Sequence, residues 1–262
     1  KWSGEHEARN FQKHLQLSID NGGRDADIII WPETAIALSS TMDVRVLQEA
    51  LNEVFRPEAV LMTGILEYEM TMDGPRVYNR LGVYNGLVER LATYDKYKLV
   101  PFGEFLPFEK LWPVNPVAGG GLMFTRGAGS QTIEVDGAPP FAPAICYEII
   151  FPGYINRADP QPRFIVTVTN DAWYGKSAGP YQHAQMARVR AIEQGVPVAR
   201  SANTGISALV DAQGRFVKKL PLMEAGTINA PLPPEHATPY RFLGEGGFLA
   251  IIALLFGLAV YT

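Results

Sequence analysis

Short apolar runs rich in β-branched residues recur along this chain and alternate with segments of helical periodicity. A run of this kind, bounded by turn residues, is typical of a strand that is buried on both faces. The clearest example is Ile28-Ile29-Ile30-Trp31, which follows the turn at Asn21-Gly22-Gly23. Further strands are predicted at residues 60–65, 142–146, 164–169, 196–201 and 206–211.

Helical segments separate several of these strands. Between Glu5 and Ile19, apolar residues lie among polar ones in a pattern typical of an amphipathic helix, and residues 44–55 and 182–194 also favour helix. Residues 78–84 and 86–94 predict a β-hairpin that turns around Asn85-Gly86. Strands that alternate with helices, together with a hairpin, predict an α/β sandwich with mixed sheets and not separate α and β domains.

The two ends of the chain are the next source of information. The sequence begins at Lys1 and has no signal-peptide pattern, so we expect a fragment or a processed chain. Phe248 to Val260 is apolar and uncharged, although it is shorter than the roughly 20 residues that span a bilayer. We expect a catalytic domain at residues 1–240, then at 241–262 a linker and a truncated transmembrane helix. A buried C-terminal helix is the alternative.

Charge and composition exclude several classes of partner and cofactor. The formal net charge is -4 and no long run of Lys or Arg occurs, so nucleic acid is not an expected partner. A single cysteine, Cys146, rules out an intramolecular disulfide. The four histidines lie in no metal-binding spacing, and no phosphate-cradling glycine loop is present. We therefore expect no metal and no cofactor.

Three polar residues lie where apolar runs end. Glu33 follows Trp31-Pro32, Lys96 lies in Tyr94-Asp95-Lys96, and Cys146 follows Ala144-Ile145. Each has a structural alternative, because the carboxylate can cap a helix, the ammonium can be a solvated loop charge, and a lone cysteine often packs as a small core residue.

Together the three residues suit nucleophilic catalysis. A thiol is nucleophilic only as the thiolate, so a cysteine enzyme needs a nearby base or positive charge. A carboxylate can take the proton, and an ammonium can stabilise both the thiolate and the oxyanion of an attacked carbonyl. A backbone N–H after the cysteine, at a sharp strand-to-helix turn, would complete the oxyanion site.

These segments resemble the carbon–nitrogen hydrolase, or nitrilase, superfamily, whose triad is Glu, Lys and Cys in this chain order. The matching motifs are WPETAI around Glu33, YDKYKLVPFGEFLPF around Lys96, ICYEIIFP around Cys146 and NDAWYG from Asn170. The resemblance covers nearly the whole chain and implies an α-β-β-α sandwich. The first strand of the family's domain precedes Lys1-Trp2 and is expected to lie outside this sequence.

The resemblance also assigns roles to individual residues. It implies that Glu33 is the general base, Lys96 the transition-state stabiliser and Cys146 the nucleophile. Further positions match family residues that support the triad or bind substrate, with scaffold as the alternative role. They are Glu104, Tyr147, Glu148, Asn79, Trp2 and Trp173.

Within the superfamily, the motifs are most similar to those of bacterial enzymes that acylate lipoproteins. The resemblance implies N-acylation of the N-terminal diacylglyceryl-cysteine of an apolipoprotein by a ping-pong reaction through a Cys146 thioester. The acyl donor would be a phospholipid, preferentially phosphatidylethanolamine. It also implies a multi-pass protein of the bacterial inner membrane, with this domain on the periplasmic, extracytoplasmic side.

The Pro/Gly-rich stretch from Pro113 to Gly129 is too long for a simple connection, which is typical of a lid or binding loop. Apolar residues at 106–108, 111–112 and 122–124 are expected to shield the thioester and contact lipid, with core packing as the alternative.

Two other functions stay open from the sequence. One is a soluble nitrilase-type amidase that acts on small amides with the same triad, and the other is a non-catalytic, membrane-attached lipoprotein-binding module. An activated Cys146 is expected to react with alkylating agents well below pH 8.5, whereas a buried structural thiol is not.

Overall fold

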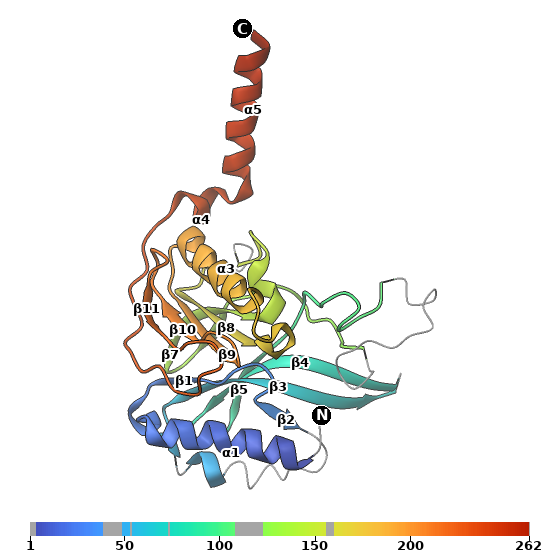
Figure 1. The fold of residues 1–262 in the computed structure, drawn as a ribbon, viewed down its shortest axis with the longest axis vertical. Coiled ribbons are helices and arrows are strands. Elements are labelled where there is room, and N and C mark those ends of the chain that lie inside the picture. The colour runs from blue at the N-terminus through green and yellow to red at the C-terminus, as the bar shows by residue number, and fades with distance from the viewer. Residues whose placement is uncertain are drawn as a thin grey trace.

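The computed structural model describes residues 4–38, 49–52, 54–72, 74–107, 123–155 and 160–261. Two β-sheets lie face to face, and helices cover their outer faces (Figure 1). Helix α1 (Gly4–Asp20) lies on one sheet, and helix α3 (Gly179–Gln194) lies on the other. The predicted α/β sandwich with mixed sheets is confirmed.

The first sheet is built around a long hairpin. Its strands run in the order β1-β3-β4-β5, with β2 also paired to β3. Both β1 and β2 are parallel to β3, whereas β4 is antiparallel to both of its neighbours, β3 and β5. The strands are β1 (Ile28–Ile30), β2 (Ile36–Leu38), β3 (Val60–Thr71), β4 (Gly74–Asn85) and β5 (Arg90–Asp95).

The second sheet has six strands in the order β11-β10-β9-β8-β7-β6. Its centre is parallel, since β8 pairs in parallel with both β7 and β9, and the outer pairs are antiparallel. The strands are β6 (Ile133–Val135), β7 (Ala138–Ile145), β8 (Phe164–Asn170), β9 (Val198–Asn203), β10 (Ala208–Val210) and β11 (Phe216–Lys219).

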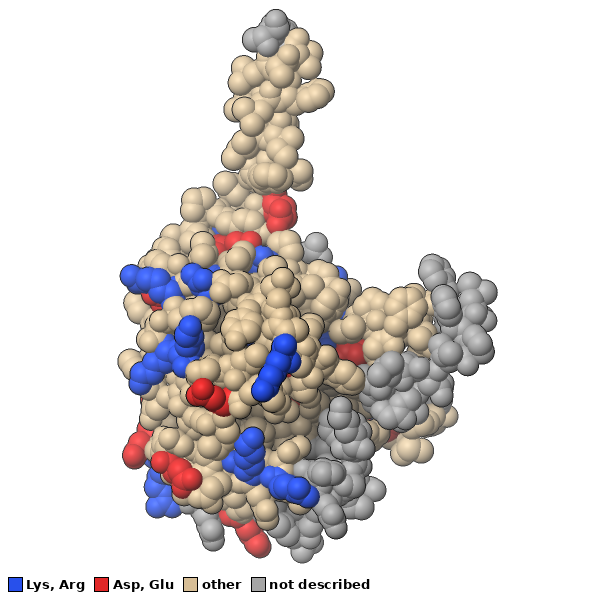
Figure 2. Space-filling model, in the orientation of Figure 1, with Lys and Arg blue, Asp and Glu red and all other residues tan. Residues whose placement is uncertain are grey.

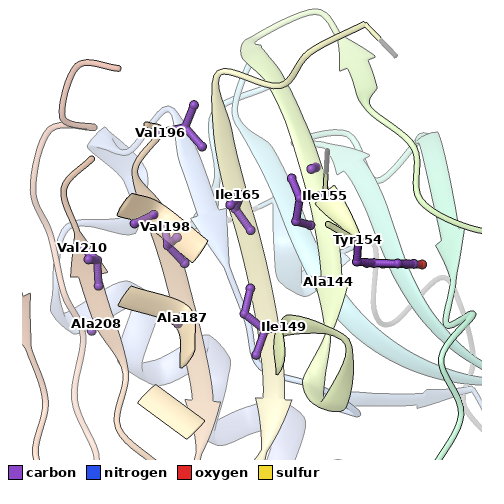
Figure 3. Close-up of a cluster of buried hydrophobic side chains, with 12 residues drawn as sticks. Ala144, Ile149, Tyr154, Ile155, Ile165, Ala187, Val196, Val198, Ala208 and Val210 are labelled. Carbon is purple, nitrogen blue, oxygen red and sulfur yellow. The ribbon is translucent and has the colours of Figure 1, made fainter. Parts of the chain in front are cut away.

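Among the hydrophobic clusters of the described residues, three join the layers to one another. One joins α1 to the first sheet through Phe11 and Trp31, and a second fills the space between the sheets around Met62, Leu81 and Val166. In the third, small side chains of α3 pack on the second sheet, where Ala187 lies near Val198, Val210 and their neighbours (Figure 3). Alanine on the inner face lets the helix approach the strands closely, which positions the loops at their carboxyl ends.

Most predicted elements are present, with some differences in their ends. Strand β7 stops at Ile145, one residue before the thiol, and β3 runs six residues past the predicted end. The hairpin at Asn85-Gly86 is confirmed, but its second strand begins only at Arg90 and not at Gly86, which leaves a loop of four residues. The Asn85 side chain accepts hydrogen bonds from the N–H groups of Leu87 and Glu89, which closes this longer loop.

Some predictions lie wholly or partly outside the described residues. Of the helix predicted at 44–55, residues 49–52 are helical. Trp2, the apolar residues 111–112, and much of the Pro/Gly-rich loop, including 113–122, are outside them.

The chain ends in two helices, α4 (Pro239–Leu243) and α5 (Glu245–Tyr261). Helix α5 stands away from the sandwich, and after Glu245 it carries no charged residue (Figures 1 and 2). In the part of the chain that the structure describes, no helix is both long and apolar enough to cross a membrane. Helix α5 has 17 residues and its apolar side chains are exposed, so the alternative of a buried C-terminal helix is wrong. The truncated transmembrane helix expected at 241–262 stays a prediction.

Candidate active site

The candidate nucleophile lies at a sharp turn between a strand and a helix. Cys146 follows the last residue of β7 and begins the 3-10 helix η4 (Cys146–Ile150), with a φ of 50°. A positive φ is strained for a residue with a side chain, so the surrounding structure must hold it. The Ile145 N–H donates to Glu148 Oε2 at 2.8 Å, and the Cys146 carbonyl oxygen lies 3.0 Å from His183 Nε2.

A buried chain of charges faces this turn. Lys96 Nζ lies 2.7 Å from Glu104 Oε1 and 3.5 Å from Glu33 Oε1, and all three side chains are buried. Burial alone would lower the pKa of Lys96, but Glu33, Cys146 and Glu104 raise it above its ordinary value. Lys96 therefore stays an ammonium ion, held between two carboxylates.

Two hydrogen bonds, in addition to the Lys96 contact, fix the Glu33 carboxylate. Asn79 Nδ2 donates to Oε1 at 2.7 Å, and the Asn170 N–H at the end of β8 donates to Oε2 at 2.7 Å. Behind Glu33, β3 contains Gly64, where an added Cβ would lie 2.4 Å from the Glu33 Cα. Glu33 is followed by a turn and then by strand β2, and not by a helix, so the alternative of a helix-capping carboxylate is wrong.

The electrostatics of the thiol follow from these neighbours. Desolvation and the charge of Glu33 raise the pKa of Cys146 to about 12, although Lys96 and a hydrogen bond with Thr169 act in the opposite direction. The resting thiol is therefore protonated at neutral pH. This raised pKa does not favour the expected alkylation of Cys146 well below pH 8.5, so a base has to remove the proton during attack.

Glu148 connects the turn at Cys146 to the segment that carries Lys96. Its Oε1 accepts hydrogen bonds from the Tyr97 N–H at 2.8 Å and the Lys98 N–H at 3.0 Å, and from two tyrosine hydroxyl groups, while Oε2 accepts from the Ile145 N–H. Burial raises its pKa, although these donors act to lower it. The carboxylate thereby sets the position of the nucleophile relative to Lys96.

The Lys96 segment is also fixed from its other side. The Lys96 N–H donates to the Asn79 carbonyl at 2.9 Å, and its carbonyl accepts from the Gly127 N–H at 3.0 Å. A Cβ at Gly127 would lie 1.9 Å from the Asp95 carbonyl oxygen, so only glycine allows this close approach. The Val100 N–H donates to Glu104 Oε2 at 2.9 Å, which closes the loop around the ion pair.

Comparison with known protein families shows which family this chain belongs to. The sequence model of the family described as carbon-nitrogen hydrolase matches residues 4–242, which is most of the chain. The chain belongs to the carbon–nitrogen hydrolase family.

This carbon–nitrogen hydrolase is similar to curated relatives described as apolipoprotein N-acyltransferase. It is 38% identical over 260 residues to the one from Rhodopseudomonas palustris, covering 93% of this chain and 48% of that protein. To the one from Rickettsia typhi it is 36% identical over 262 residues, covering 100% and 52%. The chain thus spans about half the length of the curated relatives it matches.

Solved structures of the same superfamily share the fold. An amidase from Nesterenkonia sp. superposes with a TM-score of 0.57 at 16% identity, covering 86% of this chain and 82% of that one. A carbon-nitrogen hydrolase from Helicobacter pylori superposes with a TM-score of 0.60 at 12% identity, covering 84% and 82%. At these identities the likeness establishes the fold alone.

A second buried ionic group of this carbon–nitrogen hydrolase was not predicted from the sequence. Asp171 Oδ2 lies 2.7 Å from Arg200 Nη2, and Asp171 Oδ1 lies 2.8 Å from His183 Nδ1. Burial alone would raise the pKa of Asp171, but the His183 hydrogen bond and the Arg200 charge hold it below its usual value. The group comes from η6 (Asp171–Tyr174), α3 and β9. Its only sequence signal is the position of Asp171 in the NDAWYG motif.

The remaining predicted site residues differ in their distance from this cluster. Tyr147 is half-buried beside Cys146 and meets Phe151 edge-on, with ring centroids 4.9 Å apart. Trp173 is 61% exposed in η6 and stays outside the buried cluster. Tyr174, which was not predicted, packs edge-on against His183 and has a pKa raised by burial and by Cys146.

The donor atoms of the site are paired with one another and not arranged around an ion. Among the described residues, no three His, Cys, Asp or Glu side chains form a group that could hold a metal. The chemistry that the cluster itself offers is proton removal from a thiol by a fixed carboxylate, beside a permanent positive charge.

Proposed function

We propose that this domain carries out N-acylation of apolipoproteins, with a phospholipid as the acyl donor and a Cys146 thioester as the intermediate. The observation that carries the proposal is the buried Glu33–Lys96–Glu104 chain, whose charges act on a thiol at a strained turn. The curated relatives, described as apolipoprotein N-acyltransferase, support this choice among reactions open to the family.

In the first step, Glu33 takes the thiol proton as the sulfur attacks the ester carbonyl of the phospholipid. The carbonyl oxygen becomes an oxyanion, which the Lys96 ammonium and the N–H after Cys146 stabilise. When the intermediate collapses, the C–O bond to glycerol breaks and the alkoxide receives the proton from Glu33. The products of this step are a thioester on Cys146 and a lysophospholipid.

In the second step, the α-amine of the diacylglyceryl-cysteine attacks the thioester. Glu33 takes a proton from the attacking amine, and Lys96 again stabilises the oxyanion. The C–S bond breaks, an amide forms and the thiol is regenerated with its proton. The two steps together conserve protons and oxidation states, so the reaction requires no oxidant, metal or cofactor.

The location at a membrane belongs to the same proposal. An apolar helix that extends from the sandwich, uncharged after Glu245, supports attachment of the domain to a lipid surface. We place the protein in the bacterial inner membrane, multi-pass when complete, with this domain on the periplasmic side. Phosphatidylethanolamine is the donor we favour.

The test is the mass of the intact protein after incubation with dioleoyl phosphatidylethanolamine in detergent. We expect one added oleoyl group on the peptide that contains Cys146, no addition in Cys146→Ala, and discharge by a diacylglyceryl-cysteine peptide. A label that persists in Cys146→Ala would overturn the nucleophile assignment. A protein that binds the lipopeptide but never gains the acyl group would be a non-catalytic binding module.

The second candidate is an amidase that hydrolyses small amides. Its support is the fold shared with the Nesterenkonia amidase, in a mutant of which the acetamide moiety of fluoroacetamide adds covalently at the active-site cysteine. Ammonia release from acetamide or acrylamide, without any acylation by phospholipid, would favour this candidate. Acylation by phospholipid without ammonia release would exclude it.

A further inference from the structure

Two cations lie against aromatic rings beside the active site. Lys98 Nζ is 5.4 Å from the centroid of the Tyr97 ring and 5.2 Å from that of Phe151. Arg126 Cζ is 5.4 Å from the Tyr97 ring and 5.7 Å from the ring of Phe105. Both charges therefore contact the ring that directly follows Lys96, at distances typical of cation–π interactions.

The backbone of both cations is tied to the active site. The Lys98 N–H donates to Glu148 Oε1, the carboxylate that also holds the turn before Cys146. Arg126 precedes Gly127, whose N–H donates to the Lys96 carbonyl in the close approach described above. The positions of these charges are thus set relative to the nucleophile, in contrast to cations on free surface loops.

Neither cation has a carboxylate partner within the described parts of the chain. The buried Arg80 and Arg200 are each paired with acidic side chains, whereas Lys98 and Arg126 are in no such ion pair among these residues. Lys98 is half-buried and Arg126 is exposed. Two positive charges on one aromatic ring, with no carboxylate partner among the described residues, can attract an anion from solution.

A series of aromatic rings leads from the nucleophile to these charges. Tyr147, which follows Cys146, meets Phe151 edge-on at 4.9 Å, and Phe151 contacts the Lys98 ammonium. Tyr97 then lies between Lys98 and Arg126 in the series of contacts. A path of aromatic rings that leads from Cys146 to two cations suits a ligand with an ester at one end and an anionic group several atoms away.

We propose that Lys98 and Arg126 form the subsite for the phosphodiester of the phospholipid donor. This inference rests on the proposed acyltransfer, because it assigns where one end of that donor binds. The guanidinium can make two parallel hydrogen bonds to the phosphate oxygens, and the ammonium adds a point charge. The glycerol then lies along Tyr147 and Phe151, with its ester carbonyl at Cys146.

The experiment compares two donors that differ only in the phosphate headgroup. Acylation of Cys146 is measured in the purified protein in detergent micelles, with dioleoyl phosphatidylethanolamine or with dioleoylglycerol. We expect the wild type to prefer the phospholipid by roughly fiftyfold, and Lys98→Met and Arg126→Met each to reduce that ratio about five- to tenfold. The matched control is Lys219→Met, since Lys219 also lies 5.4 Å from an aromatic ring, Phe216, but on β11. It should leave the ratio unchanged.

The outcomes separate this inference from the proposed function. Suppose that phospholipid acylates the wild type, but both variants lose acylation rate equally with the two donors, or the wild type does not distinguish the donors. The subsite is then wrong, and the proposed acyltransfer stands. If neither donor acylates the wild type, the proposed function fails and the inference fails with it. If inorganic phosphate inhibits dioleoylglycerol turnover, the double variant Lys98→Met/Arg126→Met abolishes that inhibition, and the wild type does not prefer the phospholipid, the cations bind free phosphate and the lipid assignment is overturned.

Discussion

Two buried ionic groups flank Cys146, one from each side of the sandwich. On the side of the first sheet lie Glu33, Lys96 and Glu104, two carboxylates with one ammonium between them. On the side of the second sheet lie Asp171, His183 and Arg200, in which one carboxylate is shared between two basic side chains. Both groups are buried and both approach the same residue, but at different atoms.

The first group acts on the sulfur. The charges of Glu33, Lys96 and Glu104 all contribute to the pKa of the Cys146 thiol, with Glu33 the largest of the three. The second group acts on the main chain, because His183 Nε2 faces the Cys146 carbonyl oxygen. We infer that the first group supplies the chemistry, and that the second holds the strained turn from which the thiol is presented. The following predictions test that division.

The largest effect is expected in the first group. Glu33→Gln and Lys96→Met should each lower the rate of acyl-enzyme formation by about a thousandfold, because one removes the base and the other the oxyanion charge. Single-turnover acylation measures this. Glu69→Gln is the control, since Glu69 pairs with Arg80 at 3.3 Å on the distant half of β3. An acylation rate of Glu33→Gln within tenfold of the wild-type rate would contradict the inference that the first group supplies the chemistry.

The second group should affect folding more than chemistry. Asp171→Asn leaves the Arg200 guanidinium buried without its partner, which should cost roughly 3–5 kcal/mol in the free energy of unfolding. Because the folded pKa of Asp171 is below its unfolded value, its contribution is present above the unfolded value and is lost as the pH falls through the folded one. Urea unfolding at neutral and acid pH measures both effects.

Asp211→Asn is the matched control for this prediction. The pKa of Asp211 is also lowered, but its partner Arg215 is largely exposed, so the expected cost is only about 1 kcal/mol. Equal losses for the two variants would show that burial of the Asp171 group does not matter.

A smaller effect is expected where the second group meets the nucleophile. His183→Leu removes the contact with the Cys146 carbonyl oxygen, so the sulfur is held less accurately for attack. We expect kcat to fall about ten- to a hundredfold, with KM nearly unchanged. His183→Gln can still donate from its amide nitrogen and should recover part of the loss. Steady-state kinetics of both variants test this. A change in KM alone, or no recovery with Gln, would contradict a positioning role.

The smallest effect concerns the reactivity of the resting thiol. Glu33 raises and Lys96 lowers the pKa of Cys146, so alkylation by iodoacetamide at pH 8 should become a few-fold faster in Glu33→Gln and a few-fold slower in Lys96→Met. In the wild type the rate should rise throughout pH 7 to 10, without a plateau near the ordinary pKa of about 8.5. Mass spectrometry of the Cys146 peptide measures the rates. A shift in the same direction for both variants would contradict the assignment.

Periodicity and turn chemistry predicted the longer elements of the fold well. The amphipathic pattern up to Ile19 and the β-branched runs at β1 and β8 carry local signals that burial reinforces. Strands β2, β6 and β11 were missed because they have three or four residues and, unlike the equally short β1, do not consist of β-branched residues throughout. The distal half of β3 was missed because it leaves the core and alternates with exposed residues.

The site was only partly predictable for a different reason. Glu33, Lys96 and Cys146 each follow an apolar run or lie in a recognisable motif, so their residue types and order pointed to a reaction. His183 is a single histidine inside a helix whose buried face also carries Ala184, Ala187 and Ala191, and Arg200 lies within a strand. Nothing local distinguishes them from ordinary residues, because their contacts depend on how α3 and β9 come together. The raised thiol pKa was likewise invisible without the arrangement of charges.

The close contact between Gly64 and the Glu33 backbone has a consequence for natural variation in this domain. Strand β3 has no reacting group at that position, yet one methyl group there would meet the Glu33 Cα at 2.4 Å and the Pro32 carbonyl oxygen at 2.5 Å. The loop would have to retreat, taking its carboxylate away from the sulfur. A Gly64→Ala allele would therefore produce a folded but inactive protein, which a survey confined to polar residues would overlook.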